Sequence, residues 1–321
     1  MRGSAPLPAR GMIPLDPHYG HRPRFGRCPN CGGRGIMPLP EGIGEAEPPR
    51  KGKNMSDINL FTAAKAKKSL GQHFLHDERV VQRIVDLLRV EEGDQVMEIG
   101  PGPGALTKLL RPLPWSRLLL LEKDDHYASE HAARPLPGLE VVPGDALAFP
   151  WEELEGPWKI AGNLPYNVAS PMMWDIVCRV PGLARAAFMI QKEVGDRLLA
   201  KPGGKDYGAL TVWIQSFVAV QKGFVIGPSA FSPPPKVDSA VVVFTPLPAE
   251  KRPNHPERLS RLIKICFQQR RKQLQTILRH AEPQRFSPEI LAALGIEGTQ
   301  RPETLTVMQF QQLADALFSE K

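Results

Sequence analysis

A glycine- and proline-rich loop between two expected elements constrains the fold of this chain more than any other segment. It reads Glu98-Ile99-Gly100-Pro101-Gly102-Pro103-Gly104, after an expected strand at 95–99 and before a helix that begins near Ala105. Glycines in such a loop let the backbone approach a ligand closely, and a helix N-terminus presents N–H groups. A strand, a glycine loop and a helix in this order are typical of an α/β sheet that binds a ligand at the carboxyl ends of its strands.

Strand and helix patterns alternate around this loop. Asp77 is expected to cap a helix whose apolar residues recur at helical spacing. The alternation indicates a Rossmann-like α/β fold, with a parallel sheet and helices on both of its faces. Further strands are expected at 117–121, 139–142, 158–161 and 186–190, and a hairpin at the sheet edge from 224–226 and 240–244.

Composition divides the chain into three parts. Residues 1–54 hold ten Pro and ten Gly and lack periodicity, so we expect a disordered extension that buries too little apolar surface to fold. Residues 55–247 carry the α/β pattern, which predicts a catalytic domain. Residues 248–321 are helical throughout, with Thr306 and Gln309 as a capping box, which predicts a small C-terminal all-helical domain.

The extension contains four side chains of the types that bind zinc. They form an HxxH pair followed by a CxxC pair: His18, His21, Cys28 and Cys31. Zn²⁺ takes such ligands tetrahedrally, but the loop between the pairs is short and lies among glycines and prolines. We therefore interpret the spacing as coincidental within a disordered segment and predict no metal site.

Bulk composition limits the class of protein. Lys and Arg outnumber Asp and Glu by 41 to 34, and the net charge of +7 fits a nucleic-acid partner. Four cysteines among 321 residues are too few for a disulfide scaffold. Because no apolar run approaches the ~20 residues of a membrane helix and no signal-peptide core is present, we expect a reduced, cytoplasmic protein.

Two carboxylates follow the next strands. Glu122 ends the second strand, where a carboxylate accepts hydrogen bonds from both hydroxyls of a ribose. Asp145 follows the third strand, within reach of the edge of an adenine ring. A dinucleotide cofactor would also need a glycine loop and an acid, and a site that binds neither ligand is a further alternative. The spacing GxGxG rather than GxGxxG favours S-adenosylmethionine, which has no pyrophosphate to bind.

A second motif, Asn163-Leu164-Pro165-Tyr166, ends the fourth strand, where an open α/β sheet places its active site. The exocyclic N6 of adenine is a poor nucleophile because its lone pair is delocalised into the ring. The Asn163 side-chain oxygen and the Leu164 carbonyl would accept its two N–H groups and direct the lone pair at a methyl donor. Pro165 stiffens that carbonyl, and Tyr166 offers a ring on which an extruded base stacks. A structural turn is the alternative.

Four blocks in order resemble the ribosomal RNA adenine N6,N6-dimethyltransferases, most closely those of the small-subunit (16S) RNA. The blocks are Gly71–Leu75, Glu98–Gly104, Asn163–Asn167 and Phe231–Ser239. The resemblance implies an S-adenosylmethionine-dependent enzyme that adds two methyl groups to each of two adjacent adenosines in the 3′-terminal hairpin of that RNA. It also implies that the substrate is the assembling 30S subunit. We expect a monomer.

The resemblance assigns roles to individual residues as well. Asn163 would contact both the donor and the target, and Phe231 would enclose the flipped adenine opposite Tyr166. Many family members have Asn at the position of His73, so no specific side-chain bond is implied there. The implied catalytic residues are Asn163, Leu164, Pro165, Tyr166 and Phe231, and the implied donor-binding residues are His73, Leu75, Gly100, Gly102, Glu122, Asp145 and Asn163.

A basic segment follows the sheet. Residues 251–285 carry ten Lys or Arg against two acidic residues, a balance that would give salt-dependent binding to phosphates. A solvated helix face is the alternative, and Arg270 falls on the apolar stripe, where it would instead bridge the two domains. The predicted RNA contacts are Arg270, Arg271, Lys272 and Lys236.

The sequence is also compatible with two rival functions. A large-subunit rRNA adenine methyltransferase of the resistance type would share the cofactor and the chemistry and differ only in its target RNA. A ribosome-assembly or transcription factor on the same fold would lack catalysis, although the intact motif at 163–166 argues against this.

Overall fold

The structure, a computed structural model, describes residues 73–319, and its centre is a seven-stranded sheet. Its strands are β2 (Gln95–Ile99), β3 (Arg117–Glu122), β4 (Leu139–Pro143), β5 (Trp158–Asn163), β6 (Leu183–Gln191), β7 (Val218–Ile226) and β9 (Ser239–Pro246). Their order is β4-β3-β2-β5-β6-β9-β7. The first five strands in this order, from β4 through β3, β2 and β5 to β6, run parallel to one another. Strand β9 pairs antiparallel with both β6 and β7.

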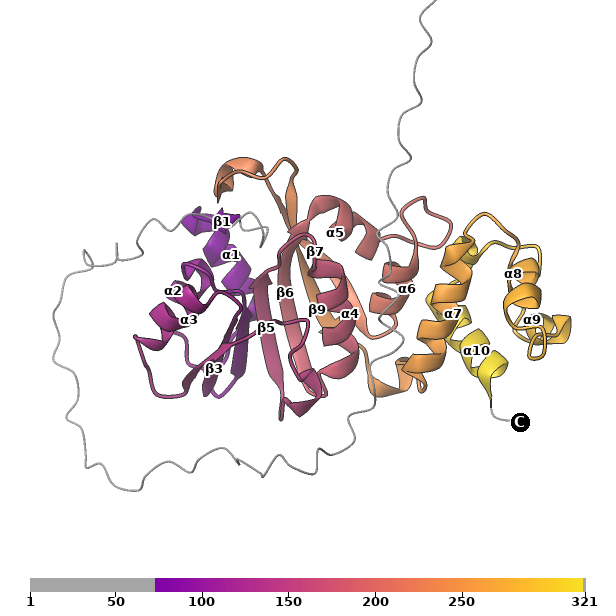
Figure 1. Cartoon of the computed structure of the whole chain (residues 1–321), viewed down its shortest axis with the longest axis horizontal. Coiled ribbons are helices and arrows are strands. Elements are labelled where there is room, and N and C mark those ends of the chain that lie inside the picture. Colours follow the sequence, from indigo (N-terminus) through magenta and orange to yellow (C-terminus); the bar gives the residue numbers. More distant parts are fainter. Residues whose placement is uncertain (1–72, 320–321) are drawn as a thin grey trace, which may run out of the picture. The chain divides into compact units, whose positions relative to one another are not determined.

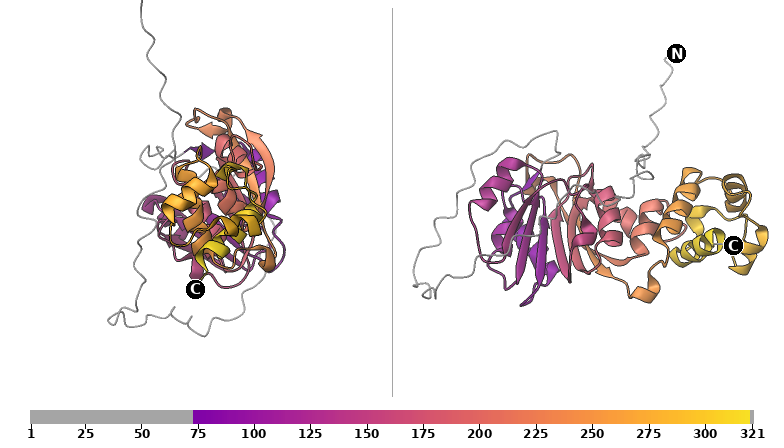
Figure 2. Two further views of the ribbon diagram at one scale, coloured as in Figure 1. Left: turned by 90° about the vertical axis from the view of Figure 1, so that its right-hand side faces the viewer. Right: turned by 60° about the horizontal axis from the view of Figure 1, so that its bottom comes forward.

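Helices cover both faces of the sheet (Figures 1 and 2). One face packs against α1 (Glu78–Leu88) and α2 (Ala105–Leu110). The other face packs against α4 (Ala169–Arg179), α5 (Lys192–Leu198) and α6 (Ala209–Gln215). Helix α3 (Asp125–Ala132) lies beside β3 and β4. Short 3₁₀ helices are η3 (Trp151–Glu153), η4 (Pro228–Ala230), η5 (Ala249–Lys251) and η6 (Pro302–Thr304).

Local sequence explains several of these elements. The Asp77 carboxylate accepts hydrogen bonds from the backbone N–H groups of Arg79 and Val80, so the predicted N-cap of α1 is confirmed. The strands β2 and β3 are buried along almost their whole length, as expected of parallel strands that are covered on both faces. Among the helices of the described residues, none combines the length and the apolar content that crossing a bilayer requires.

Four helices follow the sheet: α7 (Pro256–Gln268), α8 (Leu274–Ala281), α9 (Pro288–Ala293) and α10 (Val307–Phe318). The predicted capping box of Thr306 and Gln309 is confirmed at the start of α10. Helix α7 packs against α6 and α10 (Figure 1). One hydrophobic cluster runs from the sheet into these helices. The predicted boundary between residues 247 and 248 therefore stays a prediction.

The α/β fold with C-terminal helices is confirmed, with two differences from the sequence-based expectation. The sheet is mixed rather than parallel, because the expected hairpin, confirmed as the pair β7 and β9, joins β6 in the antiparallel sense. A ribbon of β1 (Phe74–Leu75) and β8 (Phe231–Ser232) was not expected, since two-residue strands have no periodic pattern. The extension at 1–54, with its four candidate zinc ligands, lies outside the described residues.

Candidate active site

The carboxyl ends of β2, β3, β4 and β5 meet at one edge of the sheet and border a pocket. The short strand β1 contributes a further wall. The pocket brings together most of the residues expected from the sequence. These are His73, Leu75, Gly100, Gly102, Glu122, Asp145, Asn163, Leu164, Pro165 and Tyr166.

The glycine loop crosses the pocket in left-handed backbone. The φ angles are +66° at Gly100, +51° at Gly102 and +90° at Gly104, a region that side chains disfavour. A Cβ on Gly102 would approach Cε1 of Phe74 to 3.3 Å. The Gly102 N–H donates to Oε2 of Glu122 at 2.8 Å, which holds the loop against the end of β3.

Glu98 lies beneath this loop and is 1% exposed. Its Oε2 accepts a hydrogen bond of 2.6 Å from the hydroxyl of Thr107, in the first turn of α2. Burial raises the pKa of Glu98 to about 8, and the neighbouring Glu122 adds to the shift. The carboxyl group is therefore mostly protonated at neutral pH, so it ties β2 to α2 without adding a full negative charge.

Glu122 connects the glycine loop to the segment that follows β3. Its Oε1 accepts from the Asp124 N–H at 2.8 Å, while Oε2 accepts from Gly102. Burial raises the pKa of Glu122, although hydrogen bonds from the backbone N–H groups of Asp124, Gly102 and Lys123 oppose the shift. A carboxylate has about four lone-pair positions, so acceptor capacity remains for a ligand.

Asp145 lies on the loop after β4. Its Oδ1 accepts from the Leu147 N–H at 3.0 Å, and its Oδ2 lies 2.8 Å from the ammonium group of Lys123, which also lines the pocket. Burial by itself would raise the pKa of Asp145, but the bonds from Lys123 and Leu147 outweigh it and hold the pKa below its ordinary value. Asp145 is therefore a fixed carboxylate acceptor at the pocket wall.

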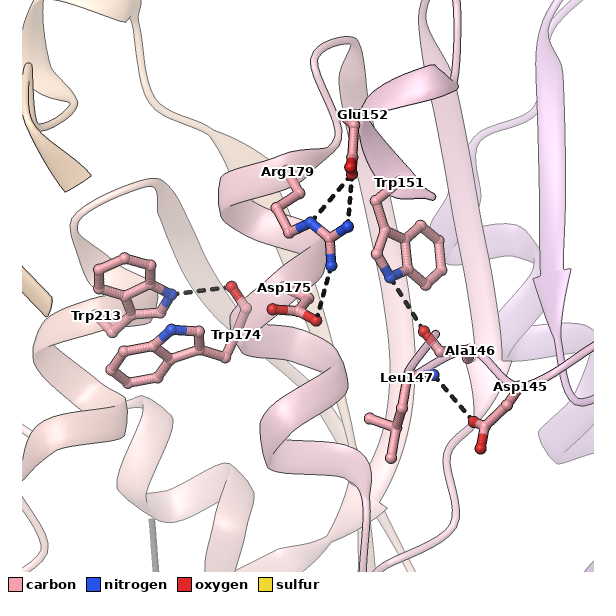
Figure 3. A network of polar contacts seen from close by, with 9 residues as sticks. All are labelled: Asp145, Ala146, Leu147, Trp151, Glu152, Trp174, Asp175, Arg179 and Trp213. Carbon is pink, nitrogen blue, oxygen red and sulfur yellow. Dashed lines mark hydrogen bonds and ion pairs between the residues drawn. The ribbon is translucent and has the colours of Figure 1, made fainter. Parts of the chain in front are cut away.

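Figure 3 shows the contacts that support this loop from behind. The indole N–H of Trp151, a fully buried residue of η3, donates to the Ala146 carbonyl at 3.1 Å. The adjacent Glu152 accepts from Nη2 of Arg179 at 2.6 Å. Arg179 ends α4, the helix that follows the Asn163 motif. The segment after β4 is therefore braced against the C-terminal end of α4.

The second motif begins where β5 ends. The Asn163 amide nitrogen donates to the His73 carbonyl at 2.8 Å, which leaves Oδ1 as the end of the amide that accepts. The Leu164 N–H donates to the Met189 carbonyl at 3.0 Å, and the Pro165 carbonyl accepts the N–H groups that open α4. Within residues 73–319, no hydrogen bond engages the Leu164 carbonyl.

The Tyr166 ring closes the pocket on one side. It stacks on the His73 imidazole, with centroids 5.7 Å apart and an angle of 25° between the ring planes, and its hydroxyl lies 2.6 Å from the Ser239 hydroxyl. His73 Nδ1 lies 2.8 Å from the Pro233 carbonyl and must carry the hydrogen, because a carbonyl only accepts. The first, third and fourth sequence blocks thus meet at Tyr166.

Five expected site residues lie away from the pocket lining. Phe231, on β8, is 3% exposed and packs in a hydrophobic cluster with Leu75, so its contact with a target base stays a prediction. Lys236, Arg271 and Lys272 are exposed. Arg270 donates to the Tyr207 carbonyl at 2.7 Å and lies 3.3 Å from Glu303, so it bridges the segment before α6 and the C-terminal helices.

Sequence reasoning assigned no role to Glu98, Lys123, Trp151 or Arg179. Glu98 opens the glycine motif, and Lys123 directly follows Glu122, so both positions carried a signal. Trp151 and Arg179 had none, because their roles depend on which loop packs behind the pocket.

Comparisons agree with this geometry. The family model for ribosomal RNA adenine dimethylase matches residues 63–318. The ribosomal RNA small subunit methyltransferase A of Nitratidesulfovibrio vulgaris (strain Hildenborough) is 53% identical over 259 residues, which cover 79% of this chain and 97% of that protein. The protein of the same name from Lawsonia intracellularis is 49% identical over 251 residues, which cover 77% of this chain and 92% of that one.

Solved structures give the same picture. A dimethyladenosine transferase from Plasmodium falciparum is 27% identical, with a TM-score of 0.65 and coverage of 75% of this chain and 96% of that one. The 23S rRNA methyltransferase ErmE is 25% identical, with a TM-score of 0.56 and coverage of 76% and 99%. The chain therefore belongs to the ribosomal RNA adenine dimethylase family and is a methyltransferase.

Proposed function

We propose that this chain dimethylates the N6 amines of two adjacent adenosines in the 3′-terminal hairpin of small-subunit (16S) rRNA, with S-adenosylmethionine as the methyl donor. The observation that carries the proposal is the Asn163 amide, fixed by His73 in the pocket that also holds the glycine loop, Glu122 and Asp145. The relatives named for the small-subunit RNA support the choice of target. We further propose that the chain acts on the assembling 30S particle, as a monomer, in the cytoplasm.

The pocket residues fit an adenosine-containing donor. The remaining acceptor capacity of the Glu122 carboxylate suits a ribose hydroxyl, and the Asp145 carboxylate suits an adenine amine. Gly100 would lie beneath the methionine part, where its left-handed backbone leaves room, and His73 and Leu75 would form the remaining wall. S-adenosylmethionine supplies an electrophilic methyl group on its sulfonium.

The acceptor side of the pocket would align the target amine. The Asn163 Oδ1 and the Leu164 carbonyl would accept the two N6–H groups and draw the nitrogen toward tetrahedral geometry. The N6 lone pair then forms the new N–C bond as the S–C bond breaks, and the proton passes to water. No strong general base is required, so alignment and electrostatics supply the catalysis. A second transfer on the same nitrogen gives the dimethylated base.

The target adenine would stack on the aromatic group at the pocket mouth. Tyr166 is held by Ser239 and His73, so its ring has a fixed orientation before a base arrives. Phe231 is proposed to enclose the base from the other side, which requires that the β1–β8 ribbon shift when RNA binds.

The RNA would also contact a basic surface beyond the sheet. Arg271 and Lys272, in the turn after α7, are exposed and suit phosphate contacts, as does Lys236 in the loop before β9. We propose that Arg270 supports this surface indirectly, since its guanidinium already binds the Tyr207 carbonyl.

The test is methyl transfer from labelled S-adenosylmethionine to small subunits that lack the modification, followed by nucleoside analysis. Dimethyladenosine in the 3′-terminal hairpin, lost in the Asn163→Ala variant, supports the proposal. Transfer to large-subunit RNA instead would keep the chemistry and change the target. Donor binding without transfer to either RNA would indicate a binding factor on a methyltransferase fold.

A further inference from the structure

A buried histidine that does not line the pocket contacts the glycine loop. His131 lies in the last turn of α3 and is 2% exposed. Its Nε2 is 2.9 Å from the Gly102 carbonyl. Because a carbonyl only accepts, Nε2 carries the hydrogen and donates it. Burial, together with the positive charges of Arg134 and Arg111, lowers the pKa of His131, so the ring is neutral at pH 7.

The same glycine is held from its other side. The Gly102 N–H donates to Glu122, and Glu122 accepts in turn from the Asp124 N–H. Asp124 is the N-cap of α3, the helix that carries His131. The bonds therefore form a closed circuit from Gly102 through Glu122, Asp124 and α3 back to the Gly102 carbonyl.

This circuit matters because it orients the backbone of the glycine loop through hydrogen bonds. Gly102 has no side chain, and its φ of +51° lies in a region that a glycine leaves readily. With both the N–H and the C=O of Gly102 engaged, the peptide groups on either side of it have defined orientations. One bond comes from a proposed donor-binding residue and the other from His131.

We propose that His131 is a positioning residue for the methyl donor: its Nε2–H holds the Gly102 carbonyl, and thereby holds the glycine loop in the shape that receives the methionine part of S-adenosylmethionine. The proposal rests on the proposed donor site. It assigns to α3 a direct part in donor affinity, although no residue of α3 lines the pocket.

The test compares His131→Gln with His131→Asn in the full chain. The Gln amide nitrogen reaches the position of Nε2 and can donate to Gly102, whereas the Asn amide is one methylene shorter and cannot. Both variants place an amide in the same buried site, so the loss of folding stability that any such replacement causes should be similar in the two. His126→Asn, on the same helix with a side chain 54% exposed, is the surface control.

Binding of S-adenosylhomocysteine is measured by titration calorimetry. We expect about fivefold to tenfold weaker binding for His131→Asn, the loss of one buried hydrogen bond, and a change under about twofold for His131→Gln and His126→Asn. In the methylation assay, the donor KM should rise in the Asn variant while kcat at saturating donor is nearly unchanged. A merely structural role would lower thermal stability without this separation of KM from kcat.

Equal donor affinities for the Gln and Asn variants would overturn the proposal. If the Asn variant does not fold, His131→Met, which fills the site without a hydrogen-bond donor, takes its place in the comparison. A wild-type chain that binds no S-adenosylhomocysteine overturns the donor site and this proposal together. A wild-type chain that binds it and methylates a different RNA, with the Gln and Asn variants still separated, supports this proposal and overturns only the target.

Discussion

The side-chain amide of Asn163 donates to the backbone carbonyl of His73 at 2.8 Å, across 90 residues of sequence. Asn163 ends β5, and His73 precedes β1 at the start of the described chain. This bond fixes which end of the amide accepts, and it places the imidazole that stacks on Tyr166. In the proposed mechanism, this one contact would therefore set both the alignment of the target amine and the ring on which its base stacks.

Replacing Asn163 by Asp tests this relationship. The carboxylate keeps an acceptor oxygen but cannot donate to the His73 carbonyl, and two acceptors facing each other repel. We expect kcat to fall by roughly 10²-fold or more, the scale of losing one aligned group in a transition state, and thermal stability to fall as well, because the His73 carbonyl loses its partner. The control is Asn167→Asp, which adds the same charge to the pocket lining. Equal kcat losses in both variants would mean that charge, rather than alignment, was disturbed.

The loop behind Asp145 provides a second test. Trp151→Phe keeps a buried ring but removes the N–H that holds the Ala146 carbonyl. We expect the donor KM to rise about threefold to tenfold as this loop loosens. Trp158→Phe is a matched control. Trp158 is also fully buried, and its indole N–H donates to the backbone carbonyl of Glu155. It begins β5, at the end of the strand away from Asn163 and the pocket. It should lose similar stability with an unchanged donor KM.

The glycine loop, Glu122, Asp145 and the Asn163 motif were predictable because each ends or follows a strand whose apolar residues are visible in the sequence. Since parallel strands end at one edge, their chain order already implies that these groups meet. The β1–β8 ribbon and the Trp151 brace were not predictable, because two-residue strands and contacts between distant loops leave no local pattern. For Arg270 the sequence left two roles open, since a residue on an apolar stripe can face either solvent or a neighbouring domain.

The two groups at the far wall of the pocket should differ in importance. Asp145→Ala removes the proposed acceptor for the adenine amine, and we expect the donor KM to rise at least tenfold, as for a charge-assisted hydrogen bond. Lys123→Met removes only a partly exposed ion pair, whose side chains are 56% and 33% exposed. Such pairs contribute little, so the KM should change by less than about threefold. The reverse ranking in donor titrations would place the ligand on Lys123 instead.

Buried Glu98 should make stability depend on pH. Its pKa is about 8 in the folded chain against 4.5 as the ordinary value, so the folded state holds a proton that the unfolded chain releases. Its stabilising effect is complete below pH 4.5 and is lost as pH rises through about 8. Glu98→Gln cannot ionise, so its free energy of unfolding should fall less between pH 6 and 9 than that of the wild type. Denaturant titrations check this, with the exposed Glu78→Gln as a control that should follow the wild type.

Variants of Arg270 and of its two neighbours should have different effects. Arg270 is expected to affect the stability of the fold, whereas Arg271 and Lys272 are expected to affect the affinity for RNA. Arg270→Ala removes the bond from the turn after α7 to the Tyr207 carbonyl, which lies just before α6. We expect the free energy of unfolding to fall by about 1–2 kcal/mol. The double variant Arg271→Glu, Lys272→Glu changes only exposed side chains, so its stability should stay near that of the wild type. Its affinity for small subunits should fall. The slope of log affinity against log salt should decrease in magnitude by roughly 1–2, because a complex that has lost two phosphate contacts releases fewer counterions when it forms. An unchanged salt slope in the double variant, with methyl transfer intact, would move the RNA-binding surface to another face of the protein.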